Sequence, residues 1–132
     1  MSREIPTMRD VMTSMPVTIQ SDFTVADAAQ RMYDHDIRHL PVVDGNVVVG
    51  VLTQRDLILL EGIPELDLEK VPVEQVMTKP AFTCKPEDPL DQVAQEMHDK
   101  KIGSAIVVDG VQPVGIFTTN DALKVIVDLL RS

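Results

Sequence analysis

The chain has 132 residues, enough to bury a substantial apolar interior, and 44% of them are hydrophobic. A formal net charge of −9 argues against binding to nucleic acids or anionic membranes, and the single cysteine, Cys84, excludes an internal disulfide and a cysteine-based metal cluster. Tryptophan is absent, so Val, Ile, Leu, Met and Ala must build the core. Without a signal-peptide pattern or an apolar span, the sequence predicts a cytoplasmic protein.

The sequence is internally duplicated. Residues 42–56, VVDGNVVVGVLTQRD, align without a gap with residues 107–121, VVDGVQPVGIFTTND. Over residues 11–62, seventeen of fifty-two positions are identical in the second copy, where unrelated sequences share roughly three or four. We therefore divide the chain into a first repeat (8–62), a connector (63–72) and a second repeat (73–130).

The first helix of each repeat follows different start signals. Thr24–Met32 has apolar residues at helical spacing, with Thr24 as predicted N-cap and Asp27 as its capping-box partner. In the second repeat, we expect Asp88 to cap the corresponding helix and Pro89 to occupy its first position. Both repeats therefore predict an amphipathic helix at the same place.

Two β-branched runs and a second helix follow in each repeat. The runs 39–44 and 104–109 each lead through Asp-Gly into a second run, 46–53 or 111–118, which predicts a hairpin. The second helices are expected from Arg55 to about Leu60 and from about Asp121 to Leu130. The predicted order is β-α-β-β-α in each repeat.

Each hairpin ends in the motif G-h-h-T-x-x-D, where h is apolar: GVLTQRD at 50–56 and GIFTTND at 115–121. Thr and Asp three residues apart before a helix are typical of a capping box. A cap alone does not require the glycine, so we expect Gly50 and Gly115 to admit another group close to the strand. Amides at the helix N-terminus favour an anion, and an aspartate beside them suits the hydroxyls of a ribose phosphate.

The gapless duplication, the opening VMT, the RHLPVVDG segment and the closing motif together resemble a tandem pair of cystathionine β-synthase (CBS) domains, called a Bateman module. The resemblance covers about residues 8–130. It implies an α/β (α+β) fold of two β-α-β-β-α repeats packed about a pseudo-two-fold axis, with two ligand clefts between them. It also implies a regulatory ligand, AMP, ADP or ATP, or S-adenosylmethionine, and no obligatory cofactor.

The resemblance also implies the site residues by position. Asp56 and Asp121 would bind the ribose hydroxyls, and Thr53 and Thr118 would face the phosphate. Arg38 and His39 would be phosphate partners, with Arg55 as a third cation. Backbone groups and apolar walls around the adenine would come from Thr18, Ile19, Ile37 and Pro41 in the first repeat and from Thr83, Cys84, Ile102 and Ile106 in the second.

The two repeats differ at the positions implied to hold phosphate. Where the first repeat has Arg38, His39 and Arg55, the second has Gly103, Ser104 and Asn120. The cations are therefore concentrated on the first repeat, which predicts unequal sites. The sequence leaves open which ribose aspartate shares a cleft with Arg38.

Structural explanations of the same residues stay open at this point. His39 also fits a hydrogen-bonded histidine at a strand end, Cys84 fits a buried strand residue, and His35 and His98 fit the C-termini of helices. The methionines at apolar positions fit core packing. No group of residues has the spacing of a metal site.

The sequence predicts a regulatory protein and not an enzyme, because it contains no nucleophile with a matched base and no P-loop. We expect a stand-alone energy sensor that binds an adenosine-containing ligand and signals to an unidentified partner protein. The alternatives are a sensor of S-adenosylmethionine and a ligand-independent scaffold whose Thr-Asp pairs are only caps. By the same resemblance a homodimer would form through apolar residues of the second helices: Leu57, Ile58, Leu60, Leu123, Ile126 and Val127.

Overall fold

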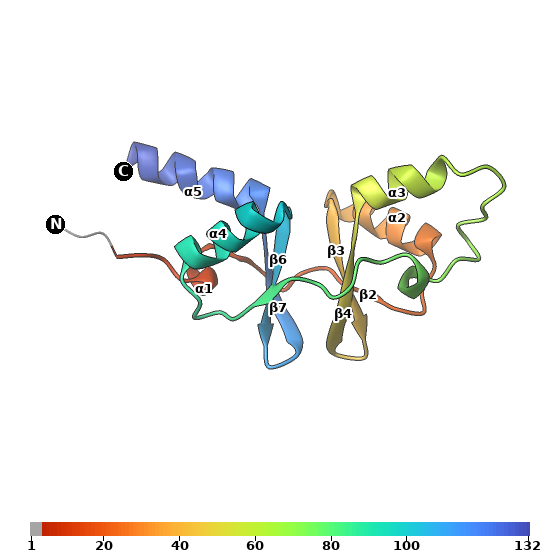
Figure 1. Ribbon diagram of the computed structural model, residues 1–132, viewed down its shortest axis with the longest axis horizontal. Helices are drawn as coiled ribbons and strands as arrows, with labels where there is room; N and C mark the ends of the chain where they lie inside the picture. Colours follow the sequence, from red (N-terminus) through yellow and green to blue (C-terminus); the bar gives the residue numbers. More distant parts are fainter. Residues whose placement is uncertain (1–3) are drawn as a thin grey trace. The chain divides into compact units, whose positions relative to one another are not determined.

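The computed structural model describes residues 4–132, which fall into two compact units. We call residues 17–81 the first-repeat unit, and residues 4–16 with 82–132 the second-repeat unit. Each unit combines a small sheet with helices, so the predicted mixed α+β class is confirmed (Figure 1). None of the helices in the described part of the chain is long and apolar enough to cross a membrane.

The first-repeat unit contains a three-stranded sheet, in which β2 (Ile19–Gln20) runs parallel to β3 (His39–Asp44) and β4 (Val47–Thr53) runs antiparallel to it. Two helices, α2 (Val25–His35) and α3 (Gln54–Glu61), lie side by side on one side of this sheet (Figure 1). They bury one aliphatic core, as the apolar spacing predicts. Its buried members are Ile19, Val25, Ala28, Met32, Leu40, Val42, Leu52, Leu57 and Val73.

The second-repeat unit repeats this sheet and adds one strand to it. β5 (Thr83–Cys84) runs parallel to β6 (Ser104–Asp109), and β7 (Gln112–Thr118) runs antiparallel to β6. The fourth strand, β1 (Thr13–Ser14), pairs antiparallel with β7. Its register places Thr13 opposite Ile116 and Ser14 opposite Gly115.

Three helices accompany this sheet: α1 (Met8–Val11), α4 (Leu90–Lys100) and α5 (Thr119–Arg131). The core beneath them is built by Met8, Cys84, Val93, Met97, Ala105, Val107 and Phe117. In contrast to the other long helices, α5 buries none of its residues, although it has apolar side chains at helical spacing. Leu123, Ile126 and Leu130 are 60%, 50% and 80% exposed.

The two hairpins have the same geometry. Each turns over two residues that begin with a glycine at positive φ, +63° at Gly45 and +65° at Gly110, where a side chain would be strained. Each also contains a register shift one pair after the motif glycine, between Val42 and Val43 and between Val107 and Val108. The Asp-Gly signal therefore predicted both hairpins correctly.

The segment VMT that opens each repeat does not join the sheet of its own repeat. Residues 11–13 lie in the second-repeat unit, where Met15 donates its backbone N–H to the Val114 carbonyl at 3.1 Å. Residues 76–78 lie in the first-repeat unit, where Thr78 and Val51 exchange two backbone hydrogen bonds, of 2.9 and 3.0 Å. The compact units therefore differ from the sequence repeats by an exchange of these opening segments.

The predicted start of the helix in the second repeat is wrong. Pro89 is the N-cap of α4, and Asp88 does not cap it, because the Asp88 carboxylate accepts the Lys85 backbone N–H at 2.8 Å instead. The first amide of α4, that of Leu90, donates to the Pro6 carbonyl at 2.9 Å. The N-terminal segment thus supplies the acceptor that we expected from Asp88.

The other elements follow the predictions closely. Thr24 and Asp27 form the predicted capping box at the start of α2. Residues 63–72 form turns without a regular helix, and a short 3₁₀ turn follows at Val73–Gln75. Both second helices begin one or two residues before the predicted position and extend slightly beyond it.

Candidate functional site

The first-repeat motif lies where β4 ends and α3 begins, and we call this boundary the first-repeat junction. Thr53 is the N-cap of α3, and its hydroxyl accepts the Asp56 backbone N–H at 3.2 Å. Oδ2 of Asp56 accepts the Thr53 backbone N–H at 3.0 Å, which completes a capping box. The capping explanation of this motif is therefore confirmed. Among the described residues, no hydrogen bond or ion pair engages Oδ1 of Asp56.

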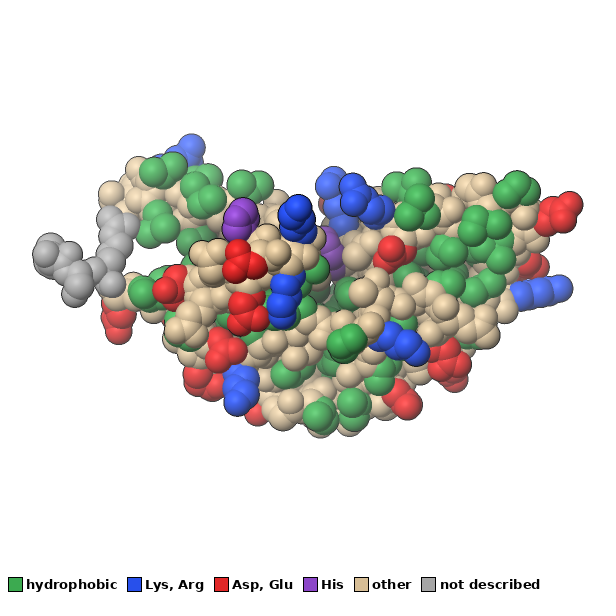
Figure 2. Space-filling view, viewed as in Figure 1, with side chains coloured by type: hydrophobic (Ala, Val, Ile, Leu, Met, Phe, Trp, Pro, Cys, Tyr) green, Lys and Arg blue, Asp and Glu red, His purple; other side chains and the backbone are tan. Residues whose placement is uncertain are grey.

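Arg38 and His39 stand beside this junction because β3 begins opposite the end of β4. His39 pairs in register with Thr53, and the Arg38 carbonyl accepts the Gln54 N–H at 2.9 Å. The Arg38 and Arg55 side chains are exposed, and Figure 2 shows basic side chains gathered over the beginnings of α3 and β3. The structure therefore brings together the five polar residues implied for phosphate and ribose in the first repeat: Arg38, His39, Thr53, Arg55 and Asp56.

The imidazole of His39 is half-buried and makes no side-chain hydrogen bond with any residue from 4 to 132. Burial lowers the pKa of His39 below its ordinary value of 6.5, the Arg38 guanidinium lowers it further, and the Asp56 carboxylate partly opposes both. The expected hydrogen bond of a purely structural histidine is thus not found. A neutral imidazole at pH 7 leaves an acceptor and a donor beside the Asp56 carboxylate.

The second-repeat motif repeats the capping arrangement at the start of α5. The Thr118 backbone N–H donates to Oδ2 of Asp121 at 2.8 Å, and the Thr118 hydroxyl donates to the same oxygen at 3.2 Å. Ser104 pairs in register with Thr118 and is buried, while the Gly103 carbonyl accepts the Thr119 N–H at 3.2 Å. The backbone of the two junctions is therefore the same.

A residue that the sequence analysis did not assign makes the two junctions different. The Thr13 hydroxyl of β1 donates to Oδ1 of Asp121 at 3.0 Å, so both carboxylate oxygens of Asp121 are engaged. Thr78 is the residue at the matching position of the first-repeat unit, and within residues 4–132 its side chain makes no such bond to Asp56. The VMT repeat was the available signal, because it placed a threonine at the same position in both copies.

The motif glycines admit a close neighbour, but that neighbour is the chain itself. A Cβ on Gly50 would lie 2.6 Å from the Met77 sulfur and 2.8 Å from the Thr78 carbonyl oxygen. A Cβ on Gly115 would meet the Met12 sulfur and would lie 3.1 Å from the Thr13 carbonyl oxygen. The exchanged VMT segments therefore account for both glycines without a ligand.

The residues implied around the adenine occupy neighbouring strands in each unit. Ile19 of β2 pairs with Val42, the neighbour of Pro41. The Ile19 side chain belongs to the core. The Thr18 carbonyl is already engaged, because the Arg31 guanidinium donates to it at 2.7 Å. In the second repeat, Thr83 and Cys84 of β5 pair with Ile106 and Val107, Ile102 packs at the edge of the core, and Asn120 is exposed on the first turn of α5.

Cys84 is a core residue, as its strand position predicts. Its side chain is 6% exposed, and burial raises the pKa of its thiol to about 12, with the Asp88 and Glu96 carboxylates acting in the same direction. A thiol held protonated is a poor nucleophile and a poor metal ligand. No group of three or more His, Cys, Asp or Glu side chains among the described residues could hold a metal ion.

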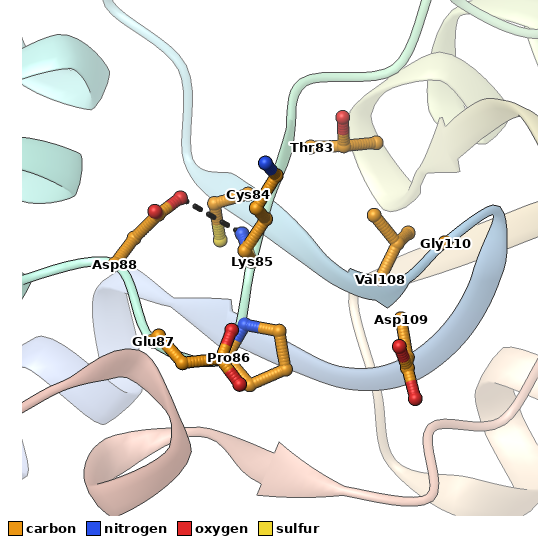
Figure 3. Close-up of a pocket in the computed structure, with 9 residues that line it drawn as sticks. All are labelled: Thr83, Cys84, Lys85, Pro86, Glu87, Asp88, Val108, Asp109 and Gly110. Carbon is orange, nitrogen blue, oxygen red and sulfur yellow. Dashed lines mark hydrogen bonds between the residues drawn. The ribbon is translucent and has the colours of Figure 1, made fainter.

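A hollow of about 340 Å³ opens in the second-repeat unit, but it lies away from the motif. It is lined by residues 83–88 and by the end of β6, opposite the end that carries Ser104 (Figure 3). Three carboxylates, Glu87, Asp88 and Asp109, border it, and Figure 3 shows the Asp88 side chain turned back onto the Lys85 backbone. This arrangement is unsuited to an anionic ligand.

Comparison with known proteins identifies the repeats. A family model, described as the CBS domain, matches residues 8–61 and 73–128. An L-aspartate semialdehyde sulfurtransferase from Methanosarcina acetivorans is 33% identical over 127 residues, which are 95% of this chain and 25% of that protein. The CBS domain-containing protein YhcV of Bacillus subtilis is 31% identical over 86% of this chain and 81% of its own length. The chain thus spans a quarter of the first protein and most of the second.

Solved structures agree with the family. A Vibrio cholerae protein described as AcuB, for acetoin utilization, has a TM-score of 0.85 and 32% identity over 97% of this chain and 95% of its own. The CBS pair of protein MJ0100, solved with 5′-methylthioadenosine and S-adenosyl-L-methionine, has a TM-score of 0.84 and 29% identity over 95% and 98% of the two chains. The CBS domain of a bacterial CNNM/CorC family Mg²⁺ transporter, solved with ATP, has a TM-score of 0.80 and 26% identity over 92% and 87%. From the two matched repeats and this common fold, the chain belongs to the CBS-domain family.

Proposed function

We propose that this protein is a regulatory CBS pair whose first-repeat junction binds an adenosine-containing ligand, AMP, ADP or ATP. The observation that carries the proposal is the open carboxylate oxygen of Asp56 beside Arg38, His39 and Arg55. A carboxylate with an unengaged oxygen accepts sugar hydroxyls, and neighbouring cations attract phosphate. The ATP complex of the transporter relative supports an adenine nucleotide.

The proposed signal passes through the exposed apolar face of α5. This face offers Leu123, Ile126 and Val127 to a second copy of the chain, and Ile58 and Leu59 of α3 are exposed in the same way. A dimer through these helices would bury side chains that the isolated chain leaves in water. The ligand would then act on a partner protein by favouring one arrangement of the dimer over another.

Two alternatives remain. The complex of MJ0100 with 5′-methylthioadenosine and S-adenosyl-L-methionine favours a sensor of sulfur-containing adenosyl ligands. The capping boxes favour a ligand-independent scaffold, because the side chains of Thr53 and Asp56 already bond to each other's backbone amides. Isothermal titration with AMP, ADP, ATP and S-adenosylmethionine distinguishes these possibilities.

Asp56→Asn tests the role of the carboxylate, and the chain offers a matched control. Thr24 and Asp27 form a second capping box with the same two distances, 3.0 and 3.2 Å, at the start of α2. The control variant is Asp27→Asn. Asp56→Asn and Asp27→Asn should each lower the free energy of unfolding by a similar amount, up to about 2 kcal/mol. Only Asp56→Asn should weaken nucleotide binding, by at least about tenfold, because it replaces one acceptor of the ribose hydroxyls with a donor. Equal nucleotide affinities in the two variants, or no binding of any ligand by the wild type at millimolar concentration, would contradict the proposed site and support the ligand-independent scaffold.

A further inference from the structure

The hydrogen bond from Thr13 to Asp121 limits what Asp121 can accept. A carboxylate offers about four lone-pair positions on two oxygens. Oδ2 of Asp121 already accepts two donors from Thr118, and Oδ1 accepts the Thr13 hydroxyl. One position remains. Asp56 accepts a single hydrogen bond on Oδ2 from the described residues, so three of its positions remain open.

We infer that Thr13 acts as a latch on the second-repeat junction, resting on the function proposed above. Two ribose hydroxyls need two open acceptor positions, which Asp56 offers as it stands. Asp121 has one open position, on Oδ1, and can accept both hydroxyls only if the Thr13 hydroxyl leaves that oxygen. Thr13 is therefore a positioning residue that keeps the second-repeat junction closed to a nucleotide while the first remains open.

The latch also couples ligand binding to the N-terminal segment. Thr13 lies in β1, which is two residues long and pairs with β7 at the edge of the sheet, and its side chain is exposed. The Met12 side chain lies against Gly115 of β7, and Met8 of the preceding α1 is fully buried in the core of this unit. Release of the Thr13 hydroxyl would thus loosen β1 while Met8 keeps the segment attached. Occupancy of the second-repeat junction is then reported by the mobility of residues 12–15.

The test measures AMP binding to the full chain with Asp56→Asn as background, so that the second-repeat junction is observed alone. Thr13→Val removes the hydroxyl and keeps a β-branched side chain suited to a strand. We expect it to raise the affinity for AMP about three- to tenfold, the worth of one hydrogen bond. Thr78→Val is the matched control and should change nothing, and Thr13→Ser should restore the affinity of the background. Adding Asp121→Asn should abolish the gain.

Hydrogen exchange provides a second readout that needs no ligand. Without AMP, Thr13→Val should speed exchange of the amides of residues 12–15, and Thr78→Val should not. In the protein with Thr13 intact, saturating AMP should produce the same acceleration. An unchanged AMP affinity in Thr13→Val, or an equal gain in Thr78→Val, would overturn the latch while the first-repeat site stands. If neither the wild type nor any variant binds AMP, the proposed function fails, and the latch fails with it.

Discussion

The two repeats build the same junction and equip it differently. In both, an antiparallel strand ends in a threonine whose backbone N–H is held by the aspartate three residues later, at 3.0 Å in the first and 2.8 Å in the second. The surroundings differ, because the first has Arg38 and His39 where the second has Gly103 and Ser104. In addition, Oδ1 is free in Asp56, whereas Oδ1 of Asp121 accepts the Thr13 hydroxyl. The duplicated fold therefore keeps the same backbone geometry at both junctions, and the neighbouring side chains determine which copy is open to a ligand.

The largest expected difference between the units concerns the motif glycines. Gly50→Ala would place its Cβ 2.8 Å from the Thr78 carbonyl oxygen, a backbone atom of a segment tied to Val51 by two hydrogen bonds. We expect a loss of about 2–3 kcal/mol of unfolding free energy. Gly115→Ala mainly meets the flexible end of Met12 and should cost about 1 kcal/mol.

Urea unfolding of both variants measures this difference. Gly62→Ala is the control, because its nearest neighbour would be 3.5 Å away and its backbone is helical, with φ of −80°. This change should be neutral or stabilise the protein by a few tenths of a kcal/mol. Equal losses at Gly50 and Gly115 would show that both opening segments yield alike.

The next largest effect should come from converting the first junction into the second. Arg38→Gly with His39→Ser should weaken AMP binding about tenfold, since it removes a charged donor to the phosphate and a neutral imidazole. Adenosine, which has no phosphate, should bind the variant as it binds the wild type. Arg9→Gly removes an exposed cation in the other unit, which pairs with Glu87, and should leave both affinities unchanged. Similar losses for AMP and adenosine would mean that Arg38 shapes the site and does not recognise charge.

The two units should also limit stability at opposite ends of the pH range. The lowered pKa of His39 means that, as pH falls below 6.5, the unfolded chain takes up the proton first, so stability is lost toward acid. The pKa of Cys84, raised from 9.0 to about 12, means that the unfolded chain loses its proton first, so stability falls as pH rises from 9 toward 12. Urea titrations across pH measure both slopes. Cys84→Val should remove only the alkaline contribution, and His39→Ser only the acid one.

The smallest expected effect is proton uptake on binding. A phosphate beside His39 raises the pKa of the imidazole in the complex above its lowered value in the free protein, so AMP affinity should rise as falling pH protonates the imidazole. Calorimetry in two buffers of different ionisation enthalpy measures the protons taken up. The phosphate of AMP titrates as well, and comparison with His39→Ser removes that shared part. The same uptake in both proteins would place the phosphate away from His39.

Much of the fold followed from local sequence. Both predicted central strands, 39–44 and 104–109, are found with the predicted bounds, because a β-branched run ending in Asp-Gly defines its own turn. The capping boxes of Thr24, Thr53 and Thr118 were also predictable, since the bonds that form them span only three residues. The identity of the ribose and phosphate residues came instead from a resemblance, and the structure adds only that they lie together in each unit.

The sequence by itself determined the duplication, the order of elements and the cation difference between the copies. Each of these depends on neighbouring residues or on the constant spacing between matching positions of the two repeats. Only the tertiary structure decided that Met12 fits against Gly115, that Pro6 and not Asp88 accepts the first amide of α4, and that Thr13 bonds to Asp121. These contacts join segments about a hundred residues apart, where no local propensity acts. They form because Met8 of the first repeat is buried in the core of the second-repeat unit, which holds the N-terminal segment against that unit.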